Sequence, residues 1–261
     1  MPEDDLLMVV ELAGVEGHRL TVSADVVRLS GVPSLMARYR TTFNPATGEH
    51  IQHVVTGLES DGAVVRYRWT SDPGGAIVDH THPGSTEIFT ILEGTCDFTV
   101  GGKHITLGPG ETGIVPPGVV HSENNRSGML VRGVVELQPA AKTAELHDTL
   151  AGIGSDLPHE PNGAPKSLLQ LGATFWYFRD DIRATAPPVW LQNLFLPILS
   201  GLASMRGVLP ERPEWDSRLP DDAADPEPLF DERAYAVQLA SAGYGFPISD
   251  PTPLDRRVDL A

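Results

Sequence analysis

Apolar and polar residues alternate in short runs between residues 42 and 137, and Gly, Pro and Asn interrupt these runs at close intervals. This pattern is typical of an all-β domain built from short strands. In one run, Val65, Tyr67 and Trp69 alternate with arginines, so the apolar set should face the interior. We predict strands at residues 51–56, 63–70, 75–82, 86–92, 96–100, 103–107, 112–115, 119–125 and 129–137.

After Pro139 the apolar residues recur at helical spacing. We predict helices at residues 142–150, 166–178 and 188–205. The last contains Pro197, which should kink it. It is too short and too polar to span a membrane, which needs about 20 apolar residues. Two interpretations of this helix stay open: it packs on the barrel or on a partner subunit, or it forms a lid over the barrel mouth.

These patterns divide the chain into four regions. We predict a β-rich or mixed extension over residues 1–41, a barrel over 42–139, a helical extension over 140–210 and an acidic, Pro-rich tail over 211–261. From Glu211 to Glu232, nine residues are acidic and only two are basic. This composition predicts a solvated surface loop or a partly disordered segment.

Three histidines and one glutamate in the barrel region are spaced as ligands of one metal ion. His80 and His82 alternate on one strand, so their side chains point to the same face. Glu87 opens the next strand after a turn, and His121 follows a second turn. Imidazole and carboxylate are common ligands of divalent transition metals. Four ligands from three strands can meet only where a sheet curls on itself. The predicted fold class is therefore mainly β, an antiparallel barrel or jelly roll with a C-terminal helical extension.

The four candidate ligands lie within two longer motifs. The first has the spacing G-x5-H-x-H-x4-E-x6-G, and the second has the spacing G-x5-P-x-G-x2-H-x3-N. The matching residues are Gly74, His80, His82, Glu87 and Gly94 in the first motif, and Gly110, Pro116, Gly118, His121 and Asn125 in the second. Both motifs resemble those of the cupin superfamily. Neither occurs twice, so the resemblance implies a single-cupin chain and argues against the bicupin oxalate decarboxylases.

The resemblance implies a small-molecule substrate and leaves three classes of function open. The first, which we favour, is a non-haem oxygenase such as a dioxygenase. The second is a redox-neutral metalloenzyme, such as an isomerase, cyclase, dehydratase or lyase, and the third is a non-catalytic cupin that binds a small ligand. Glu87 argues against thiol dioxygenases, whose first motif lacks this glutamate. One divalent ion is expected at the four ligands. Fe(II) is favoured, and Mn(II), Ni(II) and Zn(II) suit the same ligands.

Several side chains share the inward parity of the candidate ligands. An aromatic-lined cavity would suit an apolar or aromatic substrate that carries oxygen. The predicted substrate contacts are Tyr67, Trp69, Phe89 and Phe98, although each ring alone also fits plain barrel core. Glu123 shares the parity of His121 and is predicted to be an acid or base near the ion. The alternative for Glu123 is a surface carboxylate.

Composition limits the partners of this chain. Its 19 basic and 35 acidic residues give a net charge of −16, which argues against nucleic acid and anionic membranes. Cys96 is the single cysteine, read as a half-buried thiol, and the acidic N-terminus does not resemble a signal peptide, so we predict a cytoplasmic protein. Apolar segments beyond the barrel, helix 188–205 above all, predict a homodimer.

Overall fold

The barrel strands form where the alternating pattern predicted them. The computed structural model describes residues 38–220, 222–242 and 257–259. Within them each predicted strand is present, and its ends lie within two residues of the predicted ends. These strands are β2 (Glu49–Val55), β3 (Val65–Ser71), β4 (Ala76–Thr81), β5 (Thr86–Glu93), β6 (Cys96–Val100), β7 (Lys103–Leu107), β8 (Thr112–Val115), β9 (His121–Asn124) and β10 (Val131–Gln138).

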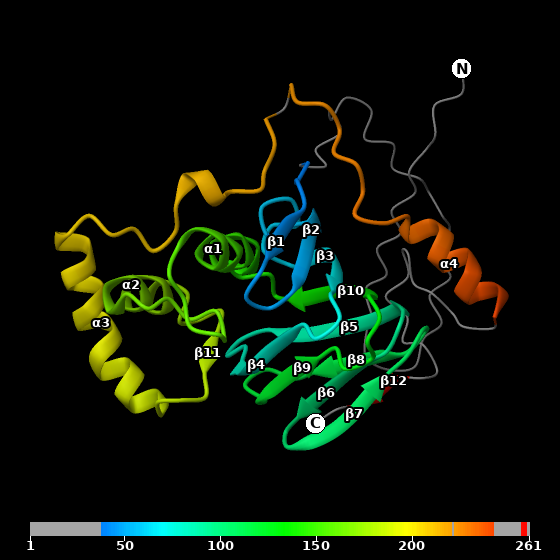
Figure 1. Ribbon diagram of the computed structural model, residues 1–261, viewed down its shortest axis with the longest axis horizontal. Helices are drawn as coiled ribbons and strands as arrows, with labels where there is room; N and C mark the ends of the chain where they lie inside the picture. Colours follow the sequence, from blue (N-terminus) through cyan, green and yellow to red (C-terminus); the bar gives the residue numbers. More distant parts are fainter. Residues whose placement is uncertain (1–37, 221, 243–256, 260–261) are drawn as a thin grey trace, which may run out of the picture.

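Two sheets face each other and enclose the barrel interior (Figure 1). One has the strand order β1-β2-β3-β10-β5-β8-β12 and the other has the order β11-β4-β9-β6-β7. Every pair is antiparallel except β12 with β8. The sequence did not reveal β1 (Thr42–Asn44), β11 (Arg183–Ala184) or β12 (Arg257–Asp259), because two or three residues are too few to show an alternating pattern.

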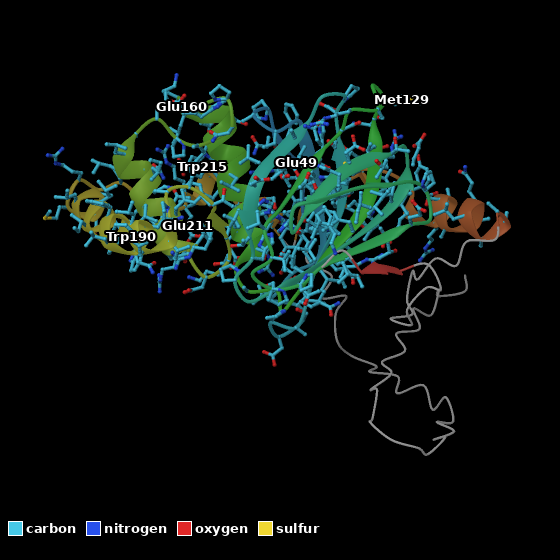
Figure 2. The ribbon with its side chains drawn as sticks, turned by 90° about the horizontal axis from the view of Figure 1, so that it is seen from below. Glu49, Met129, Glu160, Trp190, Glu211 and Trp215 are labelled. Carbon is cyan, nitrogen blue, oxygen red and sulfur yellow. The ribbon has the colours of Figure 1, made fainter. Side chains whose placement is uncertain are left out.

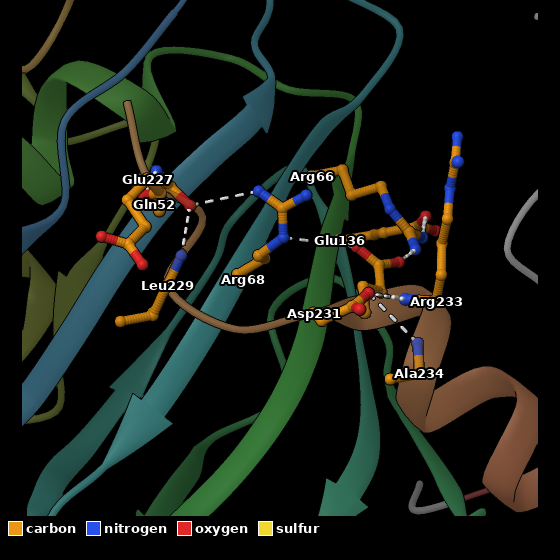
Figure 3. Close-up of polar contacts among 10 residues, drawn as sticks. Gln52, Arg66, Arg68, Glu136, Glu227, Leu229, Asp231, Arg233 and Ala234 are labelled. Carbon is orange, nitrogen blue, oxygen red and sulfur yellow. Dashed lines mark hydrogen bonds and ion pairs between the residues drawn. The ribbon is translucent and has the colours of Figure 1, made fainter. Parts of the chain in front are cut away.

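The alternation along β3 has the predicted direction. Val65, Tyr67 and Trp69 are buried in the core, while Arg66 and Arg68 lie on the outer side of the sheet (Figure 3). The same core cluster contains Phe89, Ile91, Cys96, Phe98, Val135 and Leu137. The thiol expected to be half-buried, at Cys96, is instead fully buried. Burial raises its pKa, so it is not a reactive nucleophile.

Helices of the extension lie on one side of the barrel (Figure 1). They are α1 (Thr143–Asp156), α2 (Leu168–Tyr177) and α3 (Val189–Met205). Helix α1 continues past its predicted end at residue 150 because Ala151 and Ile153 extend its buried face. Helix α3 packs along α2 and continues through Pro197 as one helix. Among the described helices, none has the length and apolar character needed to cross a bilayer.

The acidic segment is mostly the solvent-exposed loop that was predicted, but it is anchored to the rest of the fold at several points. Trp215 and Phe230 within it are buried, and its last residue, Glu232, begins helix α4 (Glu232–Ser241). Figure 3 shows the chain from Glu227 to Ala234 running across the outside of β2, β3 and β10. The main-chain N–H of Leu229 donates to Gln52 Oε1 at 2.8 Å. Burial of these apolar side chains and hydrogen bonds to the sheet hold the segment in place despite its high charge, which was the basis of the prediction from composition.

Arg66 holds the start of α4 on the sheet. Its guanidinium pairs with Glu136 at 2.6 Å and also with Glu232. The Asp231 carboxylate accepts hydrogen bonds from the N–H groups of Arg233 and Ala234, which makes it the N-cap of α4 (Figure 3). Of the predicted N-terminal extension, residues 1–37 lie outside the described residues. Within the remainder, Tyr39 is buried and forms a bridge with Arg218.

Candidate metal centre and cavity

The four candidate ligands meet inside the barrel. His80 lies in β4, His82 directly after it, Glu87 in β5 and His121 in β9. Each offers one donor atom, and these atoms all lie within 4.8 Å of one another. All four residues are buried. The register of β4 with β9 places His80 opposite His121, so the curled sheet brings together ligands that are far apart in the sequence.

Backbone carbonyls determine which nitrogen each histidine presents to the cluster. Nδ1 lies 2.9 Å from the Val78 carbonyl in His80 and 3.0 Å from the Val119 carbonyl in His121. In His82 it lies 2.7 Å from the carbonyl of Asp181 in the helical extension. A carbonyl only accepts, so each Nδ1 must carry the proton and donate it. Each Nε2 therefore faces the cluster, and its lone pair is the one with which imidazole binds a metal. Burial alone would lower the pKa of His82, but Glu87 raises it, so an ion would have to displace a proton from this ring.

The chemistry of the cluster fits a divalent cation. Glu87 Oε2 lies 2.8 Å from His121 Nε2 and 3.5 Å from His82 Nε2. Neither Glu87 Oε2 nor His121 Nε2 has a partner in hydrogen-bonding geometry, although both are buried. Burial alone would raise the pKa of Glu87, but His82 and His121 hold it well below its usual range. A divalent ion would satisfy one carboxylate and three imidazole lone pairs together.

The environment of His80 favours the neutral imidazole, the form that can bind a metal ion. Burial, followed by the neighbouring His121 and His82, lowers the pKa of His80 to about 3. A neutral imidazole is the form that binds metal, so His80 needs no deprotonation near neutral pH to act as a ligand.

A cavity of about 170 Å³ opens beside the cluster. Three of the predicted contacts, Tyr67, Trp69 and Phe89, line it. Phe98 was predicted to contact the substrate, but it is not among the residues that line this cavity. It lies behind Phe89 with the ring centroids 4.8 Å apart, and it is packed in the core. Parity along a strand indicates the inward side, but it does not separate the first layer of side chains from the second.

Glu123 lies in the cavity wall and is not a surface carboxylate. It is buried on β9, and no described residue forms a hydrogen bond with its carboxyl group. Burial raises its pKa well above the usual range, and the charges of Glu49 and Glu87 add to the effect. A buried carboxyl group with a raised pKa, beside a candidate metal site, has the chemistry of an acid or base.

Glu49 is a further cavity carboxylate that sequence reasoning missed. It accepts hydrogen bonds from Trp69 Nε1 at 3.0 Å and from Thr47 Oγ1 at 2.8 Å. Burial raises its pKa to about 7. A signal was present, since Glu49 has the inward parity of Ile51, but the predicted strand began after Glu49.

The helical extension closes the cavity. Leu146, His147 and Leu150 of α1 and Phe175 of α2 all line it, whereas no described residue of α3 does. Helix 188–205, for which a lid was one interpretation, is therefore not part of the described cavity wall. Sequence reasoning missed His147 as a cavity residue, because it lies beside the apolar face of its helix and the pattern indicates its place only weakly. It also missed Asp181, because Asp181 contacts His82 through its backbone carbonyl, which no side-chain pattern reveals.

Comparisons with known proteins agree with this geometry. The sequence model of the cupin domain matches residues 67–135. Quercetin 2,3-dioxygenase from Bacillus subtilis is 34% identical over 97 residues, which cover 34% of this chain and 29% of that protein. The rhicadhesin receptor of Pisum sativum is 33% identical over 157 residues, which cover 57% of this chain and 64% of the receptor. Each match covers less than two thirds of the relative's length.

The structure is also similar to solved structures. A predicted oxalate decarboxylase from Thermotoga maritima is 22% identical, with a TM-score of 0.36 over 41% of this chain and 97% of that one. The predicted mainly β architecture with C-terminal helices is confirmed. The chain therefore contains a cupin domain, matched over residues 67–135, and the helical extension that follows the barrel helps to close its cavity.

Proposed function

We propose that the protein is a metal-dependent enzyme that acts on a small oxygenated organic molecule, and that its reaction is a non-haem dioxygenation. One observation carries this proposal: the buried cluster of His80, His82, Glu87 and His121 borders a mostly apolar cavity. These residues would hold one divalent ion, with Fe(II) the favoured one. When bound, Fe(II) would supply redox chemistry with dioxygen, whereas Zn(II) would supply only Lewis-acid polarisation.

The protein's own residues would bind and orient the substrate. Tyr67, Trp69 and Phe89 form one apolar wall, and Leu146 and Phe175 of the extension form another. These walls exclude water from the cluster and favour a substrate with an apolar or aromatic body. In a dioxygenase both oxygen atoms enter the product, so the substrate supplies the electrons and no external reductant is required.

The resemblance to quercetin 2,3-dioxygenase supports this reaction class, but that match covers only 29% of the dioxygenase. A shared fold does not determine the reaction. The second candidate is a redox-neutral isomerase, cyclase or dehydratase. The unpartnered carboxyl group of Glu123 favours it, because such reactions move a proton beside a polarised carbonyl group. A cupin that only binds its ligand would have no need of a four-donor cluster with a proton-transfer group beside it.

Metal content is the first test of the proposal. Protein purified without added metal should contain close to one equivalent of a divalent ion by elemental analysis. The His80→Ala/His82→Ala double variant should lose it, because two of the four donor side chains are gone. A His104→Ala variant, changed on the exposed strand β7, is the matched control and should keep the metal. Equal metal content in the double variant and the control would contradict the assignment.

The reaction class is tested by oxygen consumption. With Fe(II) and a panel of single-ring alcohols and phenols, a dioxygenase consumes one O₂ for each product formed. Full turnover without oxygen, or with Zn(II), would instead establish the redox-neutral candidate. Glu123→Gln should lower turnover about 100-fold if Glu123 transfers a proton in the reaction. An unchanged rate in this variant would remove Glu123 from the mechanism.

A further inference from the structure

The cavity has an unusual balance of charge for a site that takes organic acids. Among its described lining residues there is no lysine and no arginine. The same lining contains the carboxyl groups of Glu49, Asp79, Glu87 and Glu123. An anionic ligand would meet Asp79 and, where no ion offsets it, Glu87, with no lysine or arginine among the described lining residues to compensate. The strongest favourable charge would be that of a bound ion.

Two polar side chains in this cavity have hydrogen-bonding capacity that no described residue fills. In the part of the chain that the structure describes, no residue forms a hydrogen bond with the carboxyl group of Glu123, which lines the cavity from β9. His147 on α1 makes ring contacts only, with its centroid 4.7 Å from Tyr67 and 5.6 Å from His53. Its Nδ1 is buried and has no hydrogen-bond partner among the described residues, and His147 lines the cavity, so the ring has hydrogen-bonding capacity to offer a ligand. Burial and the neighbouring His53 lower the pKa of His147 well below its usual range, so the ring is neutral and does not attract anions.

The size of the cavity limits what can occupy it. Its volume of about 170 Å³ is close to that of an apolar protein cavity of roughly 150 Å³ that accommodates benzene. A molecule with one six-membered ring and one or two polar substituents therefore fills the space. A fused or multi-ring molecule requires the α1 side of the cavity to move.

We propose that the cavity selects an uncharged molecule about one ring in size that carries a hydroxyl group, and that His147 determines this specificity. His147 would bind the hydroxyl group from the helical extension, with Glu123 as the second polar contact from the barrel. The inference rests on the proposed function, since it takes the metal cluster as the reaction site. It assigns to the extension a direct part in substrate recognition beyond closing the barrel.

Ligand affinity tests this proposal without any turnover. The probes are benzyl alcohol, toluene and benzoate, which share one ring and differ in hydrogen bonding and charge. Dissociation constants are measured by NMR titration on Zn(II)-loaded protein and on protein stripped of metal with a chelator. Benzyl alcohol should bind about 10-fold more tightly than benzoate in the stripped form, where no ion can bind the benzoate carboxylate.

A variant at His147 isolates the contribution of the hydrogen bond. His147→Phe keeps a ring against Tyr67 and should weaken benzyl alcohol about 10-fold while leaving toluene within about twofold. His104→Phe on the exposed strand β7 is the control and should change neither affinity. His147→Gln, which restores a donor and an acceptor, should recover part of the loss. It also keeps the test open if the phenylalanine variant does not fold.

Two results would overturn the proposal. One is benzoate binding to the stripped protein as tightly as benzyl alcohol. The other is an equal loss of toluene and benzyl alcohol affinity in His147→Phe, since that would show a packing role only. Failure of the proposed function is a separate outcome: absence of oxygen uptake or of metal would refute the dioxygenase but would leave these affinities as they are.

Discussion

At the scale of single residues, the candidate metal centre depends on groups that the sequence motifs do not contain. The motifs supply the donor atoms, whereas three backbone carbonyls hold the imidazoles in the tautomer that presents Nε2. One of these carbonyls belongs to Asp181, almost a hundred residues from His82. The Asp181 side chain is itself fixed, since it accepts a hydrogen bond from the Lys142 N–H at 2.5 Å. The helical extension therefore orients a ligand of the cluster as well as covering the cavity.

The burial of His53 leads us to predict that the free energy of unfolding depends on pH. It is buried, neither ring nitrogen has a hydrogen-bond partner, and burial lowers its pKa from 6.5 to about 4. The unfolded chain binds a proton below pH 6.5 that the folded chain does not bind until about pH 4. The free energy of unfolding therefore falls as the pH falls through this window. The difference of about 2.5 in pKa corresponds to on the order of 3 kcal/mol.

Urea unfolding between pH 7.5 and 4.5 measures this effect in the wild type and in His53→Phe. The variant keeps a ring against Tyr39 and His147 but does not titrate, so its stability should depend less on pH. Asp148 acts in the opposite direction, because burial raises its pKa to about 7 and its contribution falls as the pH rises. The prediction therefore concerns the difference between the two proteins, and parallel pH profiles would contradict it.

At the scale of elements, the packing of α2 on α3 depends on a glycine. A Cβ atom at Gly172 would lie 2.2 Å from Leu199 Cβ, so the helices approach too closely for any side chain there. Gly172→Ala should force them apart and destabilise the fold by roughly 1–3 kcal/mol. Gly201→Ala is the matched control on α3, since a Cβ there meets nothing within 4 Å. The control should instead stabilise the protein by up to about 1 kcal/mol through helix propensity.

Thermal unfolding and metal analysis check this prediction together. Gly172→Ala should lower the melting temperature and keep its metal, because Gly172 lies outside the cavity lining. Equal melting temperatures for Gly172→Ala and Gly201→Ala would show that the α2–α3 contact relaxes without cost.

The elements also show what the sequence could and could not predict. Strands with several alternating residues, such as β3 and β5, were predicted because burial on one face leaves a period of two. The two-residue strand β11 was not predicted, because Arg183 and Ala184 form a strand only by lying against His80 and Thr81. Helix α4 was missed because it packs on the sheet through few apolar side chains, Leu239 and Tyr235, and begins at Glu232, which closes a segment with the composition of an acidic loop. Local pattern thus predicted the barrel and its ligands, whereas long-range contacts placed Glu49, His147 and Asp181.

At the scale of the whole molecule, α3 presents an apolar face that the described structure leaves uncovered. This outer face consists of Trp190, Leu194, Phe195, Ile198, Leu202 and Met205, all exposed. Figure 2 shows Trp190 at the outside of the extension, away from Glu49 in the barrel. The opposite side of α3 buries Gln192, Leu196 and Ala203. An exposed stripe of large apolar side chains on one helix is typical of a subunit interface.

We predict that the protein is a homodimer joined through the outer face of α3. A twofold arrangement would pack this face against itself and remove it from water without using the cavity side of the extension. Light scattering at low micromolar concentration should give twice the 28.1 kDa mass of one chain. Leu194→Asp or Phe195→Asp should dissociate the dimer and leave the metal in place, because neither residue contacts the cluster. Val237→Asp, at an equally exposed apolar position on α4, should leave the dimer intact. A monomer mass for the wild type at every concentration would refute the prediction, and a dimer that survives both α3 substitutions would place the interface elsewhere.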